Sequence, residues 1–249
     1  LRFFIAFLCL LPVCLFRKNR GAWKDILPGS IVSGAALFAA SNAQQFGLAQ
    51  GAQAGKAGFI TALYIVLVPL AAVFTKPFRV WLAEAVAVAG MYFLCIAGGF
   101  SVAPSDLWLL ACAALFAVQI IAVDHFAKKV DGFVLSCGQF LVASLLSACF
   151  LGRETLTWTA ISACLWPLLY IAVLSSCVGY TLQILAQRDG EAAVVSLLLS
   201  LESFFAAVFG ALLLHERLTG REVLGCALML AAIALAELPV KKRQKASGS

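Results

Sequence analysis

The sequence predicts an all-α integral membrane protein, and three observations carry this prediction. Hydrophobic residues make up 63% of the 249 positions and charged residues only 12%. A soluble domain carries about twice that share of charge, because a folded globule needs a wettable exterior. The charged residues gather in short tracts between apolar runs of roughly twenty residues, the length of helix that spans a ~30 Å hydrocarbon core. The sequence lacks the alternating ten-residue segments of a membrane barrel, so helices are expected to satisfy the backbone hydrogen bonds.

Nine transmembrane helices are visible in this pattern, as nine apolar segments separated by short polar connections. Their expected ranges are 2–16, 27–49, 56–75, 79–98, 104–125, 131–151, 161–186, 191–214 and 219–238. Short connections make consecutive helices antiparallel neighbours and leave no room for a soluble domain between them.

Lysine and arginine are unequally shared between the two sides of this bundle. If the RKNR loop at 17–20 is cytoplasmic, thirteen of the 18 basic residues lie on the cytoplasmic side and four on the other, with Arg2 at the start of the first helix. The positive-inside rule therefore predicts a cytoplasmic basic tail at 239–249, and the bias fits a bacterial inner membrane. It also explains the net charge of +6 better than a nucleic-acid-binding face does.

The chain also resembles itself at an offset of about 135 residues. KAGFITALYIVLVPLAAVF at 56–74 aligns without gaps with EAAVVSLLLSLESFFAAVF at 191–209. The two copies are offset by five spans, and because five is odd, they cross the membrane in opposite directions. Inverted repeats of this kind let many secondary transporters alternate access. We therefore expect a first repeat at 1–98 without its first helix, a second repeat at 104–238, and a tenth helix upstream of Leu1.

Three stretches carry a family resemblance: the opening LRFFIAFLCLLP, AGKAGFITALYIVLVPLAAVF, and LQILAQRDGEAAVVSLLLSLESFFAAVFGALLLHERLTGREVLGCALMLAAIALAE. In these stretches, and over essentially its whole length, the chain resembles the EamA-type group of the drug/metabolite transporter superfamily. The resemblance implies ten helices in two inverted repeats, cytoplasmic ends, and transport of small metabolites, commonly export. The second repeat of that group often reads leucine-glutamate-proline, whereas this chain reads Leu201-Glu202-Ser203, so the helix break that the proline would cause is not implied here.

Glu202 is the first candidate for the transport pathway. It lies about eleven residues into the 191–214 span, near the bilayer midplane. A carboxylate at that depth costs about 2.5–3.5 kcal/mol on insertion scales, so it is expected to face the bundle interior or a wet cavity. Its function would be to couple transport to a proton or to bind a substrate amine. The alternative is a protonated carboxyl group that only hydrogen-bonds between helices.

Polar side chains in or near the ends of other spans are expected to continue this pathway. Asn42 and Gln45 share one helix face by their i, i+3 spacing, and Tyr180 and Gln183 share another. Under the inverted repeat these pairs would lie near opposite membrane faces, where two gates are needed. Gln119 belongs to the same polar set. The alternative for each is interhelical hydrogen bonding without substrate contact.

Three further residue groups are expected to have structural roles. Pro69 lies within a span and frees a backbone carbonyl one turn earlier, so it is a possible hinge. Asp124 and Lys128 are four apart at a helix end, which favours a surface ion pair. Glu84 is expected near the cytoplasmic start of its helix, where a carboxylate suits the helix dipole.

The function predicted is a secondary active transporter, expected to export a small metabolite, amino acid or drug-like solute by alternating access. The nine cysteines lie singly in apolar runs and no phosphate-binding loop or metal motif occurs in the sequence, so no enzyme activity, metal or cofactor is expected. The expected partners are a small-molecule substrate, the lipid bilayer and a proton as coupling ion, in a monomer or homodimer. Two alternatives remain. A membrane-embedded lipid-processing enzyme would need two convergent catalytic groups at one depth, and a non-transporting membrane subunit would seal its polar side chains without a cavity.

Overall fold

A computed structural model of the chain describes residues 1–17, 21–52, 54–70, 78–96, 103–150, 162, 164–213 and 219–237. Every regular element in these ranges is a helix and none is a strand, which confirms the all-α prediction. The RKNR tract beyond Arg17 and the basic tail at 239–249 lie outside the described residues.

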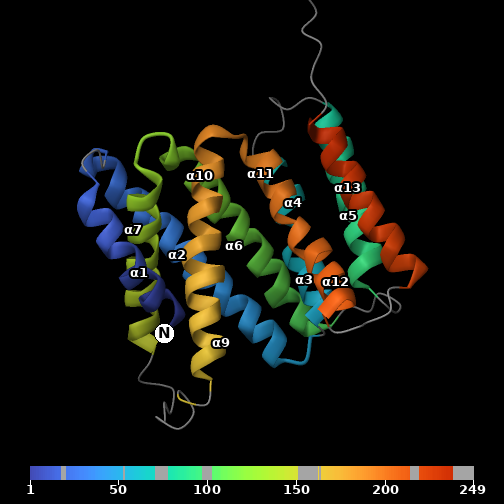
Figure 1. Ribbon diagram of the computed structural model, residues 1–249, viewed down its shortest axis with the longest axis horizontal. Helices are drawn as coiled ribbons and strands as arrows, with labels where there is room; N and C mark the ends of the chain where they lie inside the picture. The colour runs from blue at the N-terminus through green and yellow to red at the C-terminus, as the bar shows by residue number, and fades with distance from the viewer. Residues whose placement is uncertain are drawn as a thin grey trace, which may run out of the picture.

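The helices pack side by side in one bundle (Figure 1). The earlier part of the chain forms α1 (Arg2–Phe16), α2 (Trp23–Ala49), α3 (Ala54–Thr61), α4 (Tyr64–Leu70) and α5 (Phe78–Cys95). The later part forms α6 (Pro104–Ala127), α7 (Gly132–Phe150), α9 (Leu165–Tyr170), the π-helix η2 (Ile171–Tyr180), α10 (Thr181–Asp189), α11 (Ala192–Leu199), α12 (Leu201–Leu213) and α13 (Gly220–Glu237).

Five helical segments of the described chain are long and apolar enough to cross a membrane. They are Trp23–Ala49, Pro104–Ala127, Gly132–Phe150, Leu165–Asp189 and Ala192–Phe209. Three shorter apolar helical segments are Arg2–Phe16, Lys56–Leu70 and Val80–Cys95. These helices support a multi-pass membrane protein, whereas the count of nine spans stays a prediction.

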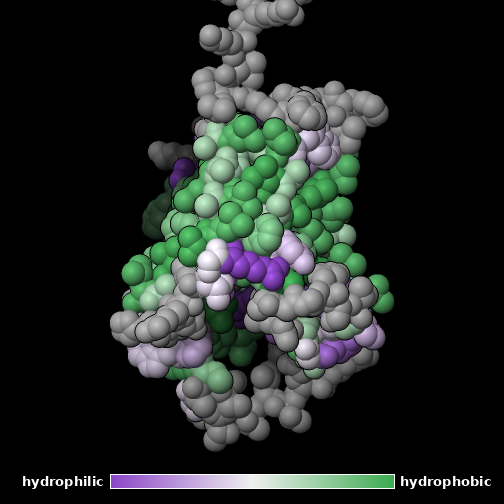
Figure 2. Space-filling model, turned by 90° about the vertical axis from the view of Figure 1, so that its right-hand side faces the viewer, coloured by the Kyte–Doolittle hydropathy of each residue, from purple (hydrophilic) through white to green (hydrophobic). Residues whose placement is uncertain are grey.

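The outer surface of the bundle is apolar, as a lipid-facing surface must be. Large hydrophobic side chains are exposed on several helices, including Ile31, Leu107, Leu145 and Leu212. Figure 2 shows the side that carries α5 and α13, where hydrophobic residues cover most of the described surface. An apolar surface of this extent would aggregate in water and indicates a membrane environment.

Glycines bring the helices into close contact at two places. A side-chain carbon on Gly34 of α2 would come within 2.6 Å of the backbone oxygen of Gln139 in α7. One on Gly225 of α13 would come within 2.7 Å of the backbone oxygen of Gly90 in α5. Without a hydrophobic effect between helices in lipid, such backbone approach is a main source of packing energy.

Two of the apolar helical segments, Lys56–Leu70 and Ala192–Phe209, are interrupted. Ala62 and Leu63 form a turn between α3 and α4, in which the Leu63 amide donates to the Ile60 oxygen at 3.2 Å. Ser200 separates α11 from α12, and its amide also reaches the Leu197 oxygen at 3.2 Å. The Ser200 hydroxyl donates to the Leu197 oxygen at 2.6 Å, and serine bonds of this kind bend helices without a proline.

The first interruption does not coincide with the proposed hinge residue. Pro69 lies inside α4, whereas the chain leaves the helical path at Ala62 and Leu63. A proline removes its own amide donor and crowds the carbonyl four residues earlier, here that of Ile65, which lies after the turn at Ala62 and Leu63. A hinge motion about either position stays a prediction.

Candidate functional site

A polar cavity of about 370 Å³ lies inside the bundle, between elements of the earlier and later parts of the chain. Helices α1, α2, α3, α4, α6, η2, α10, α11 and α12 all contribute to its wall. The lining residues are Arg2, Gln44, Thr61, Tyr64, Phe116, Gln119, Ile120, Ser175, Gly179, Tyr180, Gln183, Leu199 and Glu202. Its volume falls in the range that holds small organic solutes.

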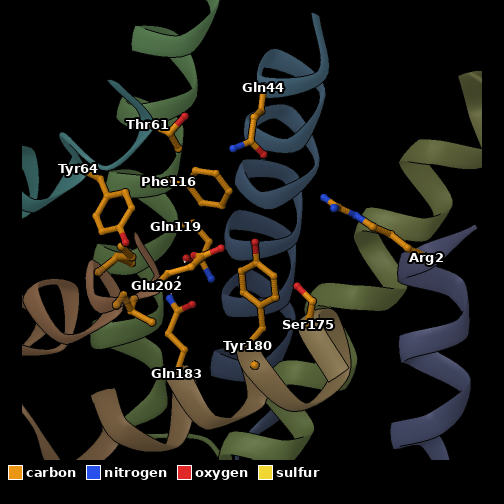
Figure 3. Close-up of a pocket in the computed structure, with 13 residues that line it drawn as sticks. Arg2, Gln44, Thr61, Tyr64, Phe116, Gln119, Ser175, Tyr180, Gln183 and Glu202 are labelled. Carbon is orange, nitrogen blue, oxygen red and sulfur yellow. Dashed lines mark hydrogen bonds between the residues drawn. The ribbon is translucent and has the colours of Figure 1, made fainter. Parts of the chain in front are cut away.

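Glu202 is the one carboxylate among these lining residues. It lies in the first turn of α12, directly after the interruption at Ser200, and its side chain is exposed to the cavity rather than packed away. Figure 3 shows it beside Gln119 and Gln183.

Aromatic side chains form a second part of the lining. The Tyr64 and Phe116 rings lie 6.4 Å apart, centroid to centroid, and the Tyr180 ring packs edge-on against Phe140 at 6.2 Å. In Figure 3 the hydroxyl groups of Tyr64 and Tyr180 point into the cavity on either side of Glu202. Rings of this kind offer apolar faces and can also stabilise a cation.

Four glutamines link three helices beside the cavity. Gln119 of α6 donates to Gln139 of α7 at 3.3 Å and accepts from Gln183 of α10 at 3.1 Å. Gln183 also donates to Gln187 at 3.2 Å, and Gln187 donates to the Ile120 backbone oxygen at 2.8 Å. All four side chains are buried, but only Gln119 and Gln183 reach the cavity wall. The network joins α6, α7 and α10 and places the amide groups of Gln119 and Gln183 at the cavity wall.

An ion pair joins the earlier and later parts of the chain near the ends of two helices. The Lys56 ammonium of α3 lies 2.7 Å from an Asp106 oxygen of α6, and both side chains are largely buried. The same Asp106 oxygen accepts from the Ala103 amide at 2.7 Å, which caps the first turn of α6. Sequence reasoning missed this pair because fifty residues separate its members.

Comparison with known proteins identifies the family. A model of the EamA-like transporter family matches residues 103–238. An uncharacterized transporter of Archaeoglobus fulgidus is 32% identical over 245 residues, which cover 96% of this chain and 75% of that protein. The chain belongs to the EamA-like transporter family. This confirms the resemblance inferred from the three sequence stretches.

Two further matches agree with this membership. A second uncharacterized transporter, from Synechocystis sp., is 28% identical over 132 residues, which cover 52% of this EamA-family chain and 40% of that protein. A crystal structure of another protein superposes with a TM-score of 0.77 and 20% identity, covering 95% of this chain and 85% of that one. The second match establishes a shared fold.

The EamA-family cavity contains four of the six residues predicted to form the pathway. Glu202, Gln119, Tyr180 and Gln183 line it together. Their common signal was a polar group placed where lipid would penalise it, and the fold gathers these groups around one space. Their part in transport stays a proposal.

The other two predicted residues do not line the cavity. Asn42 donates to the Phe38 backbone oxygen at 2.8 Å within its own helix, and Gln45 is exposed. Their neighbour Gln44 lines the cavity instead. Adjacent helical residues point about 100° apart, so Gln44 faces the cavity while Asn42 and Gln45 face elsewhere, and their part in a gate stays a prediction.

The structural predictions for the remaining charged groups have mixed outcomes. Lys128 pairs with Asp124 at 3.0 Å on the surface of α6, which confirms the ion pair. Glu84 lies in the second turn of α5 and is only 2% exposed, so it is buried in the bundle, and its position at the membrane interface stays a prediction. No group of three or more potential metal ligands occurs in the part of the EamA-family chain that the structure describes.

Proposed function

We propose that the chain is a secondary active transporter that exports a small polar or amphipathic solute, with the cavity around Glu202 as its binding site. The main support is a cavity of about 370 Å³ with one carboxylate, amides, hydroxyls and aromatic rings from both parts of the chain. A non-transporting subunit would have no use for such a space inside its bundle. An enzyme would need a second catalytic group beside Glu202.

Alternating access through two inverted repeats extends this proposal. Under the offset of about 135 residues, the turn at Ala62 and Leu63 corresponds to 197–198, close to the observed interruption at Ser200. The flanking helices α4 and α11 pack against each other beside the cavity. Interrupted helices at a repeat interface are typical of transporter binding sites, which supports nine spans of a ten-helix fold.

Glu202 is the proposed coupling residue. A carboxyl group open to the cavity can take up a proton from one side of the membrane and release it on the other, or exchange the proton for a solute amine. The basic bias supports a cytoplasmic tail at 239–249 in a protein of a bacterial inner membrane, and protons that enter the cell would then drive export.

Counterflow in proteoliposomes tests the proposed function directly. The full-length protein is reconstituted, loaded with an unlabelled metabolite and diluted into the labelled form of the same compound, over a panel of amino acids, nucleosides, sugars and amphipathic cations. We expect internal solute to accelerate labelled uptake for at least one class, because a carrier with one alternating site exchanges solutes. The proposal of transport would be contradicted if the protein binds members of the panel but internal solute accelerates labelled uptake of none of them.

A further inference from the structure

The cavity has a second charged residue, of opposite sign to Glu202. Arg2 belongs to the first turn of α1 and lines the same cavity as Glu202 of α12. Figure 3 shows Arg2 reaching toward the cavity from one side, with Tyr180 between it and Glu202. The other residues that line the cavity are neutral.

Contacts behind the Arg2 guanidinium hold it in place. One terminal nitrogen donates to the Ser41 hydroxyl of α2 at 2.7 Å, and the guanidinium carbon lies 4.5 Å from the centre of the Phe3 ring. Ser41 and Phe3 are both buried, so the anchor is firm. A guanidinium has five N–H donors, and the Ser41 hydroxyl accepts a hydrogen bond from one of them.

No carboxylate of the described chain neutralises this guanidinium. Arg2 forms no ion pair in the described ranges, and neither does Glu202, so the two charges face one cavity without touching. Separated charges in a poorly polar bundle are costly unless a partner compensates them. A solute that carries only one charge would compensate one of them and leave the other unpaired.

We propose that Arg2 is a specificity-determining residue that binds the carboxylate of a zwitterionic solute whose amine lies at Glu202. This inference rests on the proposed function, since it concerns the same cavity. A zwitterion pairs both charges at once, and the planar guanidinium suits a carboxylate through two parallel hydrogen bonds. Tyr64, Phe116 and Tyr180 supply the surface for an apolar side chain between them.

A charge series of one scaffold tests this assignment. The probes are phenylalanine, phenylalaninamide and N-acetylphenylalanine, which are zwitterionic, cationic and anionic, and binding to the full chain in lipid nanodiscs is measured by calorimetry. We expect phenylalanine to bind about tenfold more tightly than either analogue. In Arg2→Gln the ratio of the two analogue affinities should move about tenfold toward the cationic amide, and in Glu202→Gln by a similar factor toward the anionic analogue.

Two controls separate recognition from structure. Arg17→Gln removes the same charge just beyond the other end of α1, where Arg17 lies 3.4 Å from Asp131, and should leave the ratio unchanged. Arg2→Lys keeps the charge and should stay close to the wild-type ratio. If Arg2→Gln does not fold, the opposite shift in Glu202→Gln still tests the charge pair. A ratio that is unchanged in Arg2→Gln, equal shifts in Arg2→Gln and Arg17→Gln, or no binding of any probe overturns the assignment. Counterflow of another solute class would leave the transporter proposal standing in each case.

Discussion

Replacing Glu202 with glutamine is expected to abolish uphill transport while leaving solute exchange in place. Glutamine keeps the size and hydrogen bonding of the side chain but cannot take up or release a proton. One proton per solute can sustain about tenfold accumulation for each pH unit across the membrane, which equals about 1.4 kcal/mol. In vesicles that are acidic inside, wild-type protein should accumulate solute to that extent, whereas Glu202→Gln should only equilibrate it. Counterflow without a gradient should continue in the variant.

A glutamate in a similar helix position serves as the matched control. Glu222 lies in the first turn of α13, as Glu202 does in α12, but it hydrogen-bonds to Thr219 outside the cavity. Glu222→Gln should therefore accumulate solute like the wild type. If Glu202→Gln also accumulates solute normally at every pH gradient, Glu202 is not the coupling residue.

Replacing Gly225 with alanine is expected to have the largest effect on stability. The added methyl carbon would lie 2.7 Å from the Gly90 backbone oxygen and 2.8 Å from the Leu94 nitrogen, closer than real contacts allow. Backbone atoms cannot swing aside as a side chain can, so α5 and α13 must separate. We expect a loss of about 2–3 kcal/mol in the free energy of unfolding, measured by denaturant titration in detergent.

Gly58→Ala provides the same chemical change at an open position. A methyl carbon on Gly58 of α3 would meet nothing within 4 Å, so this variant should gain stability by about 0.5–1 kcal/mol. Neither α5 nor α13 lines the cavity, and the folded fraction of Gly225→Ala should bind solutes as the wild type does. Equal stability of the two alanine variants would show that the Gly90–Gly225 contact is not close.

Hydropathy alone predicted where helices form, because lipid forces each spanning segment to satisfy its own backbone. The ranges expected at 2–16, 104–125 and 131–151 lie within two residues of α1, α6 and α7. The interruptions at Ala62–Leu63 and Ser200 carried no such signal. The first is a backbone turn, and the second includes the hydrogen bond from the Ser200 hydroxyl to the Leu197 oxygen; neither changes the hydropathy of its segment.

Only those cavity residues that are polar in an apolar sequence could be predicted from the sequence. Glu202 stood out because a carboxylate in an apolar run is costly, and Gln119 and Gln183 followed for the same reason. Tyr64 and Phe116 line the cavity but resemble any other apolar residue of a span. Arg2 was counted only as a terminal charge, because its position beside the cavity depends on how α1 packs against α7 and η2.

The central claim is that solute crosses the membrane through the cavity beside Glu202, and plugging that cavity tests it most directly. Gly179 of η2 lines the cavity, and a side-chain carbon there would lie 3.6 Å from its nearest neighbour, so a large group can enter without a clash at its base. The adjacent Val178 is 43% exposed and does not line the cavity. In counterflow, Gly179→Trp should lose exchange and Val178→Trp should keep it. Full exchange by correctly folded Gly179→Trp would contradict the claim.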